Sequence, residues 1–279
     1  MRKIEEIIVK NLMRIATLII FGALFLILFT IVKRGLPAMS WDMLTKIPSG
    51  GFYIGKEGGL LNAIVGSLMM VAGSTILGLL LSIPIVIFIN LYLPKKSFLA
   101  DLTRFSSDIL FGIPSIVYGA FGFALMVYLG LKTSLLGGII ALTFLIVPIL
   151  IRSMDEVARQ IPKELKDATL SLGATKYETI RVMLKQISPG ITTAVLLSIG
   201  RAIGDAASVL FTAGYTDSIP TSLSQPAASL PLAIFFQLSS PIEEVQNRAY
   251  AAAFILTAIV LVLSLAARYY SRKFSKNKI

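Results

Sequence analysis

Long apolar runs constrain this chain more than any other feature of its sequence. Residues 15–32 hold no charge, and neither does the longer run 58–94. A run of about 18 or more apolar residues is long enough to cross the hydrocarbon layer of a membrane. Hydrophobic residues make up 56% of the chain and charged residues only 15%, whereas soluble domains carry roughly 25% charged residues. The sequence therefore predicts an all-α, polytopic membrane protein.

We expect six transmembrane helices. They are predicted at 15–32, within 58–94, at about 106–129 with Pro114 inside, at about 134–151 with Pro148 inside, at about 191–211, and between Arg248 and Arg268. An even number of spans places both termini on one side. Nineteen of the 26 Lys and Arg residues then fall at that side, against six at the other, and cytoplasmic loops carry the excess of positive charge. Both termini are predicted to be cytoplasmic.

The residue types that are absent exclude several classes of function. The chain has no Cys and no His, which removes disulfides, thiolate nucleophiles, imidazole metal sites and His-based acid–base catalysis. Its net charge of +11 is the expected signal of basic residues beside spans rather than of a nucleic-acid partner. We predict no catalytic residue, no metal site and no cofactor.

One cytoplasmic segment, 155–188, is too polar to span but has an apolar helical pattern. Apolar residues recur at spacings of three and four on both sides of Gly173, which predicts two helices. Gly173 is suited to the left-handed residue that follows a helix, and Thr175 with Glu178 has the spacing of a capping box. The segment is either an amphipathic connector resting on headgroups or an element that passes motion from a soluble partner to the spans.

Arg201 and Asp205 are the charged residues inside the predicted fifth span. A charged side chain in hydrocarbon costs roughly 2.5–3.5 kcal/mol on insertion scales, so such residues are candidates for function. In one helix, a spacing of four would put both side chains on one face. The pair is either a structural ion pair or an anion site, since a guanidinium offers a forked set of donors to phosphate oxygens.

Several motifs resemble those of one transporter family. Asp167-Ala168-Thr169, followed four residues later by Gly173, is similar to the Glu-Ala-Ala-x-x-x-Gly signature of bacterial ABC importer permeases, with Asp for Glu and Thr for the second Ala. The stretches 58–66, 112–119, 201–205 and 212–217 resemble the permeases of the phosphate-specific transport (Pst) system, and those of the PstA type most. The resemblance covers residues from about 58 to the end.

This resemblance implies an ABC importer permease (MetI-like) fold in the bacterial cytoplasmic membrane. It implies a permease core at 58–279, with a coupling loop at 155–188, preceded by an N-terminal transmembrane helix and outer loop at 1–57. The residues implied to couple to the ATPase are Asp167, Ala168, Gly173 and Thr175, and those implied to line the substrate pathway are Arg201 and Asp205.

The implied partners are two copies of a separate ATPase subunit, a second, PstC-like permease and an external phosphate-binding protein, besides the lipid bilayer. The chain itself would not be an enzyme. Two alternatives stay open at this point: a permease for another oxyanion such as molybdate or sulfate, and a self-sufficient channel or secondary transporter. An internal inverted repeat would favour the last of these, and we find none that is convincing.

Overall fold

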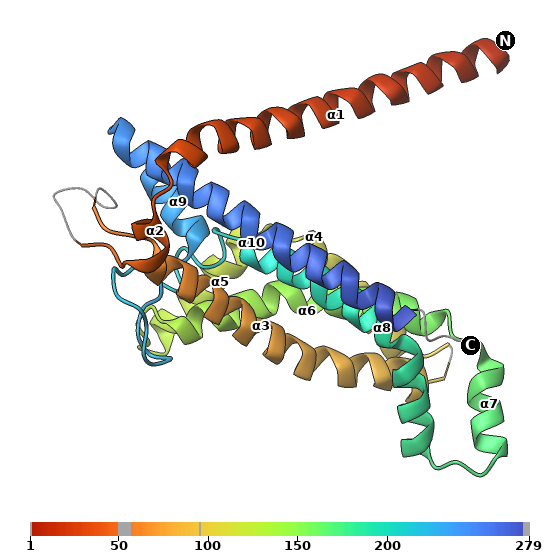
Figure 1. The fold of residues 1–279 in the computed structure, drawn as a ribbon. Coiled ribbons are helices and arrows are strands. Elements are labelled where there is room, and N and C mark those ends of the chain that lie inside the picture. Colours follow the sequence, from red (N-terminus) through yellow and green to blue (C-terminus); the bar gives the residue numbers. More distant parts are fainter. Residues whose placement is uncertain (1, 50–56, 95, 276–279) are drawn as a thin grey trace.

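The computed structural model describes residues 2–49, 57–94 and 96–275, and within these ranges the chain is helical (Figure 1). An isolated bridge between Pro48 and Gly58 is the one β-type pairing there. The elements are α1 (Arg2–Ala38), α2 (Trp41–Thr45), α3 (Leu61–Ile87), the π-helical turn η1 (Phe88–Tyr92), α4 (Phe98–Gly112), α5 (Ser115–Tyr128), α6 (Leu135–Arg159), α7 (Lys163–Ser171), α8 (Lys176–Ile203), α9 (Leu230–Leu238) and α10 (Glu243–Ser275).

Five helical segments in the described residues are long and apolar enough to cross a membrane, and a sixth span forms if α4 and α5 are taken together. This agrees with the predicted fold class. The predicted third span is wrong in one respect, because α4 and α5 meet at 100° rather than forming one helix. Proline has no N–H, and it forces the preceding residue toward extended backbone. Ile113, which precedes Pro114, has φ −72° and ψ 132° and ends α4.

The predicted fifth span is also corrected. α8 is one continuous helix that begins in the predicted coupling loop, passes through Pro189 and ends at Ile203, with Gly204 as its C-cap. The predicted helical residues 204–211 form turns instead. Asp205 explains this end, because its carboxylate accepts hydrogen bonds from both the backbone N–H and the hydroxyl of Ser208. Such local bonds compete with helical ones.

The segment from 204 to 229 is irregular, and parts of it pack inside the molecule while 221–226 are exposed. Ala213, Ala227 and Ala228 are fully buried in it. Its backbone carbonyls are satisfied by other elements: the N–H of Ser134 donates to Thr212, and the amide of Asn62 donates to Thr216. Non-helical backbone at membrane depth is tolerated only where protein or a water-filled cavity surrounds it.

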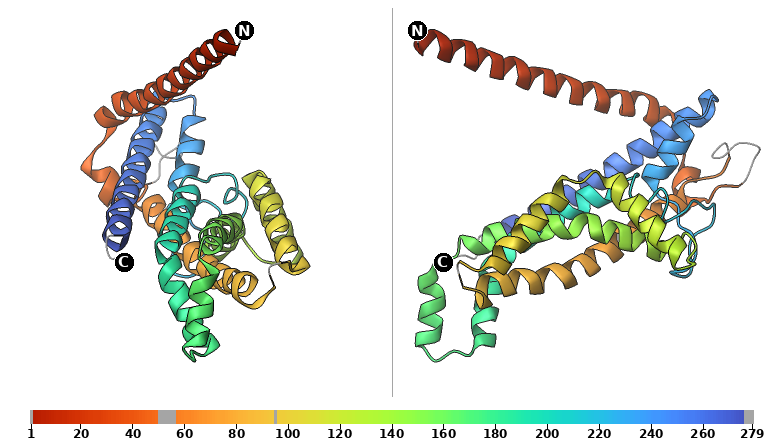
Figure 2. Two further views of the ribbon diagram at one scale, coloured as in Figure 1. Left: turned by 90° about the vertical axis from the view of Figure 1, so that its right-hand side faces the viewer. Right: turned by 180° about the vertical axis from the view of Figure 1, so that it is seen from behind.

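α6 lies at the centre of the bundle, with α3, α4, α5 and α8 around it (Figure 2). The buried core includes Met70 of α3, Leu142 and Ile146 of α6, and Ile203 of α8. α1 leaves this bundle and points away from it (Figure 1). Its C-terminal end alone packs closely, where a Cβ on Gly35 would lie 2.5 Å from the carbonyl oxygen of Tyr250 in α10.

Candidate functional site

Arg201 and Asp205 form an ion pair at the C-terminal end of α8. Nη1 of Arg201 lies 2.9 Å from Oδ1 of Asp205. Arg201 is in the last turn of the helix, where a positive charge interacts favourably with the helix dipole. Asp205 lies beyond the helix, so the expectation of one shared helix face is wrong. The pair forms because the turn at Gly204 brings the carboxylate back toward the guanidinium.

The two partners differ in exposure, and this difference matters for function. The side chain of Asp205 is 3% exposed and that of Arg201 44%. Asp205 is held by Ser208, whose N–H lies 2.9 Å from Oδ2, whereas Arg201 borders open space. A Cβ on Gly200 would meet nothing within 4 Å, and one on Gly204 would meet only a backbone oxygen at 3.9 Å. A fixed acceptor therefore faces an arginine that a further anion can reach.

The four predicted coupling residues lie on α7 and at the bend between α7 and α8. Asp167 and Ala168 are exposed on α7, and Gly173 has a φ of +80°. The side-chain oxygen of Thr175 accepts from the N–H of Glu178, and the carboxylate of Glu178 accepts from the N–H of Thr175 at 2.8 Å. The predicted left-handed bend and capping box are both present.

The apolar side chains of the α7–α8 hairpin become more exposed toward the bend. Ile187 is 5% exposed, whereas Tyr177 is 74% exposed and Leu172 88%. Figure 1 shows the bend protruding beyond the other helices. Large apolar side chains at the tip of a protruding hairpin are typical of a surface that a partner covers.

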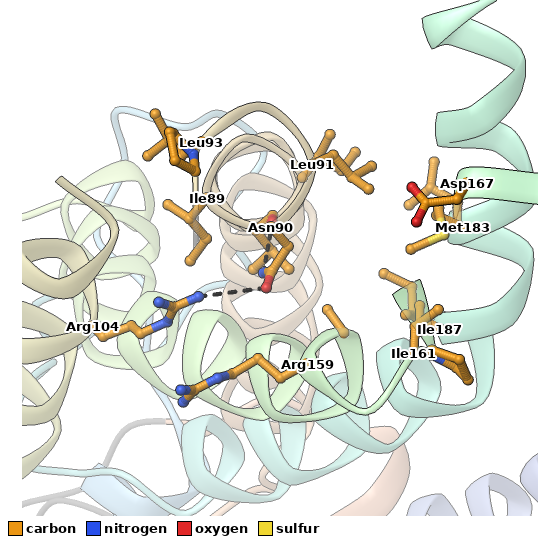
Figure 3. Close-up of a pocket in the computed structure, with 16 residues that line it drawn as sticks. Ile89, Asn90, Leu91, Leu93, Arg104, Arg159, Ile161, Asp167, Met183 and Ile187 are labelled. Atoms are coloured by element: carbon orange, nitrogen blue, oxygen red, sulfur yellow. Dashed lines mark hydrogen bonds between the residues drawn. The ribbon is translucent and has the colours of Figure 1, made fainter. Parts of the chain in front are cut away.

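A cavity of about 440 Å³ separates α7 from the C-terminal ends of α3 and α6. Asn90 of η1, Arg104 of α4, Arg159 of α6 and Asp167 of α7 contribute its polar lining, and Met183 belongs to its apolar wall (Figure 3). The hairpin is thus attached to the bundle at α8 and leaves space between α7 and the bundle.

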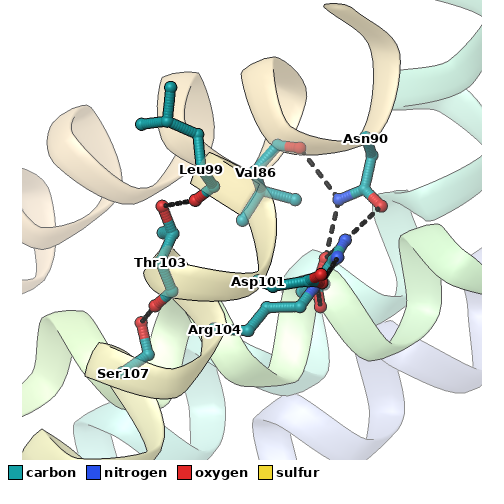
Figure 4. A network of polar contacts seen from close by, with 8 residues as sticks. Val86, Asn90, Leu99, Asp101, Thr103, Arg104 and Ser107 are labelled. Carbon is teal, nitrogen blue, oxygen red and sulfur yellow. Dashed lines mark hydrogen bonds and ion pairs between the residues drawn. The ribbon is translucent and has the colours of Figure 1, made fainter. Parts of the chain in front are cut away.

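A polar cluster beside this cavity was missed by the sequence analysis. Arg104 donates to Asp155 through Nε at 2.9 Å and through Nη2 at 3.2 Å. The amide of Asn90 donates to the same carboxylate at 2.8 Å (Figure 4). The side chain of Asp155 is 7% exposed and that of Arg104 20%. We call Arg104–Asp155 the inner pair; it ties α4 to α6, and Asn90 adds a bond from η1.

A second pair joins α4 to α6 and was missed as well. Nη1 of Arg152 lies 3.1 Å from Oδ1 of Asp108, and its guanidinium stands over the ring of Phe111 at 5.2 Å from the centroid. Both charged side chains are more than half exposed, at 56% and 57%. We call this the outer pair. The sequence signal was Asp108, a carboxylate inside the predicted third span.

Comparisons with known proteins identify the family. Residues 82–276 match the family described as "Binding-protein-dependent transport system inner membrane component". The chain belongs to this family. The "Phosphate transport system permease protein PstA" of Pasteurella multocida is 35% identical over 99% of this chain and 97% of the relative. The protein of the same name in Yersinia pestis is 38% identical, covering 89% of this chain and 84% of the relative.

The chain is thus a PstA-type permease, a multi-pass protein of the inner membrane. Solved structures agree in fold. The methionine ABC transporter MetNI in an inward-facing conformation superposes with a TM-score of 0.60 at 20% identity, covering 77% of this chain and 95% of that one. A bacterial alginate ABC transporter gives a TM-score of 0.62 at 14% identity, with 97% of both chains covered. The predicted MetI-like permease fold is confirmed, and membership does not favour a self-sufficient channel or secondary transporter.

Proposed function

We propose that this chain is one permease subunit of an ATP-driven importer that carries inorganic phosphate across the cytoplasmic membrane. The observation that carries the proposal is the accessible Arg201 beside the buried, fixed Asp205, in a chain whose relatives are named phosphate permeases. Arginine is suited to phosphate because its planar fork of N–H donors matches the oxygens of the anion.

In this mechanism Arg201 binds the phosphate and Asp205 competes with it. When the pathway is empty, Asp205 neutralises the guanidinium, so that no unpaired charge stays at membrane depth. When phosphate arrives, the exposed N–H groups of Arg201 donate to it. The neighbouring carboxylate repels the anion and keeps binding weak enough for release. One exposed arginine provides half of a pathway, and the other half comes from a second, PstC-like permease.

The energy for this cycle comes from a separate ATPase subunit present in two copies. The coupling loop docks on one of them through Asp167, Ala168, Gly173 and Thr175, with the exposed Leu172 as an apolar contact. On this reading the coupling loop and both termini are cytoplasmic. An external phosphate-binding protein delivers the anion to the opposite side. The permease core extends over 58–279, and residues 1–57 supply an additional span and outer loop.

The test is phosphate uptake by the assembled importer with variants at the ion pair. Arg201→Gln should abolish uptake at matched amounts of protein in the membrane, and Arg201→Lys should restore only part of it, because an ammonium keeps the charge but loses the fork. Uptake of sulfate and molybdate is measured in parallel to establish which anion is carried.

The double variant Arg201→Gln with Asp205→Asn separates function from scaffold. If the pair were only structural, removing both charges would restore uptake, since no unpaired charge stays buried. We expect the double variant to stay inactive, and uptake near the wild-type rate would refute a role for Arg201 in binding phosphate.

A further inference from the structure

The outer pair, Arg152 and Asp108, is more exposed than a purely structural ion pair would need to be. On α4 it is surrounded by exposed apolar side chains, among them Phe105 at 63% and Ile109 at 52%, as expected of a surface at membrane depth. A charged pair that is more than half exposed there cannot face lipid without a large cost. It therefore faces water in the pathway, lipid headgroups at the edge of the membrane, or another subunit.

The inner pair provides the contrast within the same two helices. Asp155 is buried and Arg104 is mostly covered, and Asn90 supplies a further hydrogen bond to the carboxylate. One turn of α4 away, Arg152 and Asp108 have the same chemistry with the charges exchanged between the helices, but the guanidinium of Arg152 is open on one side. A single bond to Asp108 uses one of its five N–H donors, which leaves donors for an anion.

The ring of Phe111 orients the guanidinium of Arg152 for binding an anion. It covers one face of the planar group at 5.2 Å, which fixes the orientation of the fork and leaves its edge as the side that ligands approach. Asp108 holds the group from α4, while Arg152 itself is on α6. The competition of this carboxylate with an anion therefore depends on how α4 and α6 are placed relative to each other.

The outer pair lies closer to the cytoplasmic end than Arg201. Val157 of α6 packs over Gly190 of α8, and Leu142 of α6 lines the same small cavity as Ala202 of α8. α6 and α8 therefore run antiparallel, and at 1.5 Å per residue Arg152 stands roughly 10–14 Å inward of Arg201 along the bundle.

We propose that Arg152, held by Asp108 and Phe111, is a second phosphate station, which receives the anion after Arg201 and before its release to the cytoplasm. The proposal rests on the proposed function, since it names a further site for the same substrate. Phosphate leaves Arg201, binds the free edge of the Arg152 guanidinium and displaces the competing carboxylate of Asp108. A shift of α4 against α6 then restores the bond to Asp108 and expels the anion.

The first experiment measures whether phosphate reaches this position. Because the chain has no Cys, Asp108→Cys gives a single labelling site beside Arg152 in the complex with its ATPase, partner permease and binding protein. We expect inorganic phosphate to slow modification of Cys by a small thiol reagent by about threefold or more, since the anion and reagent compete for one space. The protection should disappear when Arg152→Gln is added, and protection that persists, or none in the first place, overturns the proposal.

The second experiment measures transport in liposomes. Arg152→Gln should lower phosphate uptake by about tenfold, and Arg152→Lys by less, because the ammonium keeps the charge without the fork. Arg14→Gln is the matched control, since Arg14 is exposed on α1 outside the bundle, and its uptake should equal that of the wild type.

The outcomes separate this proposal from the proposed function. Uptake by Arg152→Gln at the wild-type rate, with uptake abolished in Arg201→Gln, refutes the second station and leaves the first. A wild-type complex that carries no phosphate refutes the proposed function and the station together. If Arg152→Gln instead prevents the second permease from co-purifying, the outer pair is a subunit contact and the station is refuted.

Discussion

The bend at Gly173 allows a quantitative test of coupling. Gly173 has a φ of +80°, and a Cβ there would meet nothing within 4 Å. Its N–H donates to the carbonyl of Leu170, and that of Ala174 donates to Thr169, which is the hydrogen-bond pattern of a Schellman motif. Because space is open, Gly173→Val carries only the conformational cost of a left-handed L-residue, roughly 1–2 kcal/mol and more with a β-branch.

This cost predicts a defined loss of coupling. A penalty of 1–2 kcal/mol changes the population of the native bend by a factor of about 5–30. Phosphate-stimulated ATP hydrolysis by the assembled complex should fall by a comparable factor when docking is limiting, while membrane insertion stays normal. ATP hydrolysis by the complex in liposomes, with phosphate-loaded binding protein added, measures coupling. The amount of permease in the membrane measures insertion.

Gly173→Asn is the matched control for this prediction. Asn, like Val, adds a side chain larger than a methyl group. Unlike Val, it adopts the left-handed region several-fold more often than most residues. We therefore expect Asn to retain most of the stimulated hydrolysis that Val loses. Wild-type hydrolysis in the Val variant would show that the bend does not position the ATPase. Equal losses for Asn and Val would show that side-chain volume at the docking surface, rather than backbone strain, is responsible.

Two further predictions concern topology and the inner pair. A Cys at Thr175 should react with an impermeant thiol reagent only from the cytoplasmic side, and a Cys at Trp41 only from outside; outside labelling at 175 would overturn the orientation. Asp155→Asn should destabilise the purified complex by about 3 kcal/mol, because Arg104 loses its buried partner, and this is measured by thermal unfolding. Asp101→Asn is the control, since Asp101 is 70% exposed at 3.5 Å from the same arginine and such pairs contribute little; equal effects would refute the distinction.

Periodicity and charge predicted the parts of the fold that depend on local sequence. Gly173 and Thr175 were assigned correctly because a left-handed residue and a capping box are local devices whose residue types are specific. The break at Pro114 was underestimated, since hydropathy responds to composition and not to the direction of the chain. The end of α8 depended on Ser208 binding Asp205, a contact that an apolar pattern does not contain.

The candidate site was predictable only where one element contributes it. Arg201 and Asp205 were found because they are four residues apart in an apolar stretch. The pairs between α4 and α6 join residues 51 positions apart for Arg104 and Asp155, so their partners become known only when helix packing is known. Asp108 alone could have indicated a pair, because a carboxylate in a predicted span requires a partner or water.

The course of α8 connects the coupling loop to the proposed phosphate site. The helix runs without interruption from its capping box at Thr175 to Arg201, a distance of about 39 Å at 1.5 Å per residue. Asp205 does not belong to this helix, because Ser208 holds it in the irregular segment, and that segment is hydrogen-bonded to the start of α6 at Ser134. On the proposed mechanism, movement of the docked end of α8 therefore displaces Arg201 relative to Asp205. The ion pair opens or closes with the position of the coupling loop, and the affinity of Arg201 for phosphate changes with it.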